Sequence, residues 1–290
     1  MANEIELMGA YWTTAGPTQP HTGQEWSNFD FGDRCEQAGK AGMKGIGIWH
    51  ADVAHIRETR SLEDMKKLLE DNGLKYLELE FIWSFFEDEG TDGRKESDEL
   101  RDLLIETAAA LGAHHIKVGN IPGVECELPK LTERYAELCA FAEERTDAVI
   151  AYEFMPFDVN VNSLDSALEV VKGAGAKNGG LVIDTWHMAK LEIAPDDLKR
   201  IPLEYLTWME LSDGNKAWME DRIEETTRFR KLPGQGEFDV KGYVRAAREH
   251  GYDDAWGIEV LSDELRAMPI EEMYKAAYET AMSQFEPVPA

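Results

Sequence analysis

The stretch GLVIDTWHM, residues 180–188, sets the pattern that decides the fold, because it is a short apolar run that ends in a single acid, Asp184. Runs of four to eight apolar, β-branched or aromatic residues are typical of buried strands. Similar runs recur along the whole chain, with helix-like stretches between them. The eight predicted strands are Glu4–Tyr11, Lys44–Trp49, Lys75–Phe81, His115–Val118, Val149–Phe154, Leu181–Asp184, Leu206–Leu211 and Trp256–Val260.

Helices are predicted between these strands. Ser61 and Ser163 provide N-cap signals for two of them, and glycines mark several returns to a strand. The predicted helices are Arg34–Ala41, Leu62–Asn72, Asp98–Leu111, Leu131–Arg145, Leu164–Lys172, Pro195–Lys199, Val240–His250 and Ile270–Phe285. Eight strand–helix units in a chain of 290 residues predict an α/β protein that folds as a (β/α)₈ TIM barrel.

A doubly wound open sheet is the rival architecture. Such a sheet usually carries a GxGxxG turn after its first strand, whereas residues 13–24 read TTAGPTQPHTGQ. The chain has no evident linker, break in composition or internal repeat, so we expect one domain over residues 1–290. The long loops at 12–29, 84–96, 119–130 and 213–238 all follow predicted strands, on the side where barrels build active sites.

The charge balance restricts the class of partner. The chain has 30 Lys and Arg against 57 Asp and Glu, a formal net charge of −27, which repels nucleic acids and anionic membrane surfaces. No apolar run approaches the roughly 20 residues of a spanning helix, and the start, MANEIELMGAYW, lacks the pattern of a signal peptide. Three cysteines without a CxxC pair favour a reducing compartment, and we expect a cytoplasmic protein.

Single acids late in otherwise apolar strands carry the functional signal. They are Glu153, Asp184, Glu210 and Glu259, on the last four predicted strands. The carboxyl ends of barrel strands converge on one rim, and burying even one unpaired charge costs several kcal/mol. We therefore expect a divalent cation there, and oxygen ligands favour Mg²⁺ or Mn²⁺. The alternative is that the acids are solvated or pair with bases such as Lys190 and Arg230.

These stretches resemble the xylose isomerase-like TIM barrels. VIDTWH is similar to the motif of the family's sixth strand, in which the Asp binds metal and the His contacts substrate, here Asp184 and His187. RKLPGQGEFDVKGYV is similar to the segment that begins with a substrate-binding Arg, here Arg230. The final GIEV is similar to the end of the eighth strand and contains Glu259.

One position departs from the family pattern. Most relatives have a His ligand on the seventh strand, where MELSD places Glu210. A fourth carboxylate makes the site harder, which favours Mn²⁺ or Mg²⁺ over Zn²⁺, with Co²⁺ and Zn²⁺ as further candidates. The additional His ligands of the family's DNA-cleaving branch are not evident, and the net charge of −27 also disfavours DNA.

The resemblance implies a metal-dependent enzyme of carbohydrate metabolism that acts on a sugar, a keto-sugar or a keto-polyol. It implies that Glu153 and Glu259 move protons at a metal-bound enediolate, while Asp184 and Glu210 mainly hold the ion. His187 and Arg230 would bind substrate oxygens. His50 is a weaker substrate-binding candidate, since a histidine packed at the end of the second strand is equally compatible with GIGIWHAD.

Three functions stay open. The first is a sugar or keto-sugar isomerase or epimerase, the second is a dehydratase or another lyase with the same first proton abstraction, and the third is a non-catalytic sugar-binding barrel. Barrels of this kind are often homo-oligomers, and we expect one here. Glu80 is expected to line the cavity or to pair with Lys117. Aromatic residues expected near the mouth, many of them as packing, are Trp83, Phe85, Phe86, Trp186, Trp208 and Trp218.

Overall fold

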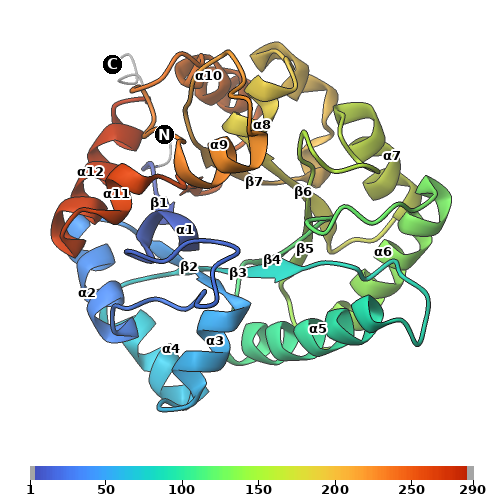
Figure 1. Cartoon of the computed structure of the whole chain (residues 1–290), viewed down its shortest axis with the longest axis horizontal. Helices are drawn as coiled ribbons and strands as arrows, with labels where there is room; N and C mark the ends of the chain where they lie inside the picture. Colours follow the sequence, from blue (N-terminus) through green and yellow to red (C-terminus); the bar gives the residue numbers. More distant parts are fainter. Residues whose placement is uncertain (1–3, 286–290) are drawn as a thin grey trace.

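A closed parallel barrel forms the centre of the computed structural model, which describes residues 4–285 (Figure 1). The strands follow one another around the barrel in chain order, from β1 to β8, and β8 pairs with β1. This confirms the predicted TIM barrel. Residues 1–3 and 286–290 of the predicted one-domain range lie outside the described part of the chain.

The strands agree closely with the predicted ones. They are β1 Leu7–Gly9, β2 Gly45–Trp49, β3 Tyr76–Ile82, β4 His115–Val118, β5 Val149–Glu153, β6 Gly179–Asp184, β7 Leu206–Leu211 and β8 Trp256–Ile258. The prediction for β1 was too long, because the chain turns at Tyr11 into a short helix that covers one end of the barrel.

The outer layer consists of helices. The longer ones are α2 Phe31–Ala41, α4 Leu62–Asp71, α5 Asp92–Leu111, α6 Leu128–Glu143, α7 Leu164–Ala174, α10 Val240–His250 and α12 Ile270–Met282. The predicted N-caps at Ser61 and Ser163 are confirmed, and both are capping boxes. The predicted short helix is the 3₁₀ helix η1, Pro195–Arg200, and a second 3₁₀ helix, η2, spans Leu203–Tyr205.

Five short helices were not predicted. They are α1 Tyr11–Thr14, α3 His50–Arg57, α8 Thr185–Lys190, α9 Arg222–Arg228 and α11 Asp263–Arg266. Two of them begin directly after a strand, so one apolar run serves both elements and the change from strand to helix leaves no break in the pattern.

Successive side chains of each strand point alternately out to the helices and into the barrel, and the inward-pointing ones are partly apolar and partly acidic. Ile183 and Met209 point outward into the main core against the helices, while Val182 and Trp208 belong to a separate small apolar cluster. Asp184 lies two residues after Val182, and Glu210 lies two residues after Trp208. Each acid therefore points to the same face of its strand as that apolar residue. The barrel interior therefore carries charged side chains toward its carboxyl end. No helix of the described residues is long and apolar enough to cross a membrane.

Candidate active site

Four buried side chains meet at the carboxyl end of the barrel. Glu153 is the last residue of β5, Asp184 is the last residue of β6, and Glu259 directly follows β8. His187 lies in the first turn of α8, three residues after Asp184, and so returns to the same face. One donor atom from each of the four lies within 4.8 Å of the others.

Arg230 closes one side of this group. Its Nη1 donates to Oδ2 of Asp184 at 2.6 Å and to Oε2 of Glu259 at 3.0 Å. Thr226 fixes the guanidinium, because its carbonyl oxygen and hydroxyl accept from Nε at 2.9 Å and Nη2 at 3.0 Å. The Nε2 atom of His187 is 3.3 Å from Oε1 of Glu153. The predicted role of Arg230 in binding substrate stays a proposal, and the structure places the residue at the cavity wall.

Lys117 of β4 occupies the centre of the barrel and is fully buried. Its Nζ lies 2.7 Å from Oε1 of Glu210 and 2.8 Å from Oε1 of Glu259. Three further carboxylates lie between 3.7 and 3.9 Å from the same nitrogen: Glu78, Glu80 and Glu153. Glu210 therefore pairs with the ammonium group of Lys117. It is not one of the four described residues that could hold a metal ion.

The centre holds more acidic than basic side chains. Six buried carboxylates lie around two buried cations, Lys117 and Arg230, and those carboxylates are Glu78, Glu80, Glu153, Asp184, Glu210 and Glu259. His115, which contacts Glu78 at 2.9 Å, adds little positive charge, since burial lowers its pKa to about 4. This excess, next to three carboxylates and an imidazole nitrogen within 4.8 Å, fits a divalent cation.

The pKa values within the group diverge. Burial raises the pKa of Glu153 to about 7 and that of Asp184 to about 6. Burial also raises the pKa of Glu259, but Lys117 and Arg230 together outweigh burial and lower it to about 2. Burial lowers the pKa of His187 to about 4, so the imidazole is neutral at pH 7 and has a lone pair for a ligand. Two carboxyls with opposite pKa shifts are typical of acid–base pairs.

Three further residues of the sequence analysis, Lys190, His50 and Lys117, have partners that the structure identifies. Lys190 pairs with Glu225 at 2.5 Å, outside the group. His50 stacks against Trp49 and Trp83, with ring centroids 4.5 and 4.9 Å away, and is not among the described residues that line the cavity. The predicted pairing of Glu80 with Lys117 is present at 3.9 Å, and the sequence signal for the larger central ion pair is a lysine inside the apolar stretch HHIKVGN.

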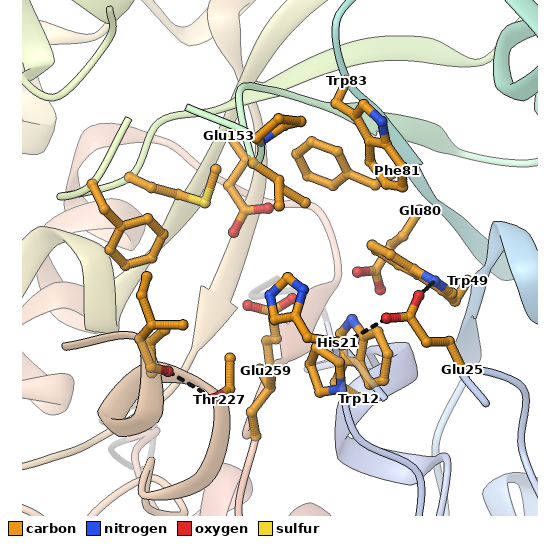
Figure 2. Close-up of a pocket in the computed structure, with 18 of the residues that line it drawn as sticks. Trp12, His21, Glu25, Trp49, Glu80, Phe81, Trp83, Glu153, Thr227 and Glu259 are labelled. Carbon is orange, nitrogen blue, oxygen red and sulfur yellow. Dashed lines mark hydrogen bonds between the residues drawn. The ribbon is translucent and has the colours of Figure 1, made fainter. Parts of the chain in front are cut away.

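A cavity of about 480 Å³ opens above the group, and its polar lining includes Glu80, Glu153, His187, Arg230 and Glu259. Figure 2 shows Trp12, Trp49, Phe81 and Trp83 on one side of this space, with Glu153 and Glu259 facing it. Of the aromatic residues expected near the mouth, Trp83 lines the cavity. Four others are buried elsewhere in the structure, namely Phe85, Phe86, Trp186 and Trp208.

Comparisons with known proteins agree with this architecture. A family model described as xylose isomerase-like TIM barrel matches residues 35–283. A 3-dehydroshikimate dehydratase of Pseudomonas aeruginosa is 27% identical over 82% of this chain, which spans only 37% of that protein's length. An inosose isomerase of Bacillus velezensis is 27% identical over 76% of this chain and 79% of its own.

A solved structure has the same fold. The IolI protein with a bound zinc atom superimposes with a TM-score of 0.79 at 22% identity, over 97% of this chain and 98% of its own. Because the family model extends over most of the chain and the barrel is complete, the protein belongs to the xylose isomerase-like TIM barrel family.

Proposed function

We propose that the protein is a divalent-metal-dependent isomerase or epimerase of a sugar or keto-sugar. The observation that carries this proposal is the meeting of Glu153, Asp184, His187 and Glu259 at the floor of the cavity. The inosose isomerase relative, named for a reaction of a cyclic keto-polyol, supports the same substrate class. The dehydratase and the isomerase are enzymes, which favours catalysis over a binding function.

Glu153, Asp184, His187 and Glu259 would hold the ion, as Mn²⁺ or Mg²⁺, with Co²⁺ and Zn²⁺ as further candidates because the set includes an imidazole. The IolI protein, which has the same fold, was solved with a bound zinc atom, and this supports metal binding by a barrel of this kind. A divalent cation bound there would polarise a substrate carbonyl and so acidify the neighbouring C–H bond.

Glu153 and Glu259 are proposed to move the proton. They come from β5 and β8, which are separated in the barrel by β6 and β7, so they approach a bound molecule from different directions. Both carboxyl groups line the cavity, so each is within reach of a molecule bound there and can exchange a proton with it. Arg230, held by Thr226, donates hydrogen bonds to substrate oxygens.

A dehydratase is the second candidate, and the 3-dehydroshikimate dehydratase relative favours it. Its first step is the same removal of a proton next to a carbonyl, and the loss of a β-hydroxyl follows. The outcomes differ in the product, because elimination forms a conjugated enone and releases water. A new ultraviolet absorbance with keto-polyols such as inososes would favour this candidate.

Deuterium exchange tests the proposal. The metal-free protein is reconstituted with Mn²⁺, incubated in D₂O with a panel of aldoses, ketoses and inososes, and the products are examined by NMR. We expect deuterium at the carbon next to the carbonyl for at least one substrate, and none without metal. A panel without exchange, together with saturable sugar binding, would instead indicate a non-catalytic sugar-binding barrel.

A further inference from the structure

The cavity has a second chemical character besides its acidic floor. Trp12, Trp49, Phe81, Met155 and Leu261 form a hydrophobic cluster that is separate from the main core of the barrel. All five line the cavity, and Trp83 packs against the cluster from the same side. The ring of Trp49 is in the middle, with centroid distances of 5.0 Å to Trp12, 5.9 Å to Trp83 and 6.4 Å to Phe81.

The faces of these aromatic rings offer no hydrogen bonds to a polyol. The indole Nε1 of Trp49 already donates to Oε2 of Glu25 at 3.0 Å, as the dashed line in Figure 2 shows. A sugar hydroxyl pressed against a ring face would lose its bonds to water without replacement, which is unfavourable. Polar side chains surround this wall, with His21, Glu25 and Glu80 beside it (Figure 2) and Glu153, His187 and Arg230 at the acidic floor.

The cavity is large enough for a ligand with both a polar part and an apolar part. A cavity of about 480 Å³ falls in the range that encloses drug-sized ligands, which exceed a free monosaccharide in size. Flat indole faces bind flat apolar rings through offset or edge-on stacking. The net charge of −27 also favours a neutral extension of the substrate over an anionic one.

We infer that the substrate is a sugar or keto-sugar joined to an apolar ring, as in an aryl glycoside, with the ring against the aromatic wall and the polyol over the acidic floor. This inference rests on the proposed function, which identifies the polar part of the substrate as a sugar or keto-sugar. Trp83 is the specificity-determining residue that suits a test, because it lines the cavity while being only partly buried.

Binding of a matched pair tests the inference. Phenyl β-D-glucopyranoside and methyl β-D-glucopyranoside share one sugar and differ only in the ring. Isothermal titration calorimetry with the Mn²⁺-loaded protein is expected to show about tenfold tighter binding of the phenyl glycoside, with a more negative heat-capacity change. Trp83→Ala should remove most of this preference while changing the affinity for the methyl glycoside by less than about twofold.

Trp26→Ala is the matched control. Trp26 stacks on His55, with ring centroids 5.2 Å apart, and is not among the described residues that line the cavity, so its replacement should keep the preference. Equal affinities for the two glycosides in the unmodified protein, or no binding of the phenyl glycoside at millimolar concentration, would overturn the inference. Deuterium exchange with free sugars would still stand in that case, so failure of the inference is distinguishable from failure of the proposed function.

Discussion

At the scale of single residues, the proposed chemistry depends on the carboxyl groups of Glu153 and Glu259, which both line the cavity. Glu153→Gln and Glu259→Gln keep the side-chain shape but cannot transfer a proton. Each is expected to lower kcat by about a hundredfold or more while the substrate still binds. Steady-state kinetics and calorimetry with the Mn²⁺-loaded variants measure both quantities. Turnover close to that of the unmodified protein in either variant would exclude that carboxyl from proton transfer.

The raised pKa of Glu153 also makes stability depend on pH. The folded state holds this proton more tightly than the unfolded state, where the pKa is near 4.5. The contribution to stability is therefore complete below pH 4.5 and is lost as the pH rises through about 7. Metal-free Glu153→Gln should gain free energy of unfolding, relative to the metal-free unmodified protein, between about pH 5 and pH 8. The measurement is the free energy of urea unfolding of both proteins as a function of pH. A constant difference between the two proteins across this pH range would contradict the prediction.

Lys117 is the residue on which the barrel interior depends most. Lys117→Met leaves carboxylates buried without their ammonium partner, and we expect it to lower the free energy of unfolding by about 3–5 kcal/mol. Lys75→Met is the control, because Lys75 is largely exposed and its 2.5 Å pair with Glu6 should contribute less than about 1 kcal/mol. Urea unfolding of the metal-free proteins measures both. Equal losses of unfolding free energy in the two variants would show that the buried ion pairs of Lys117 contribute no more to stability than an exposed pair.

At the scale of elements, acids on two neighbouring strands have different contacts. Asp184 on β6 and Glu210 on β7 are register partners, but Asp184 joins the four-residue group and Glu210 contacts Lys117. Asp184→Asn is therefore expected to weaken Mn²⁺ binding by more than about a hundredfold, and Glu210→Gln by less than about tenfold. Calorimetric titration with Mn²⁺ checks both variants. A larger loss with Glu210→Gln would restore Glu210 as a ligand.

At the scale of the whole molecule, the net charge of −27 makes the folded chain repel itself. Salt screens this repulsion over a Debye length of about 10 Å at 0.1 M, so added sodium chloride is expected to raise Tm by a few degrees. Differential scanning calorimetry of the metal-free protein measures the shift, and potassium chloride at equal ionic strength is the control. A Tm that falls with either salt would show that attractive ion pairs outweigh the repulsion.

The sequence by itself determined the barrel and the position of its acids along the strands. Apolar runs such as that of β7, Leu206–Leu211, and capped helices such as α4 are local patterns, so they can be recognised without knowing their neighbours. The parallel order of the strands then places Glu153, Asp184 and Glu259 at one end, because all barrel strands run in the same direction.

Only the tertiary structure decided which acid has which partner. Lys117 lies 93 residues before Glu210 and 142 before Glu259, and the closure of the barrel brings the three together. Strand order does not reveal which side chain each acid contacts, and the contact with Lys117 distinguishes Glu210 from the group containing His187. The aromatic wall likewise needed the fold, because Trp12 and Trp83 follow different strands and both pack on Trp49, which ends a third strand.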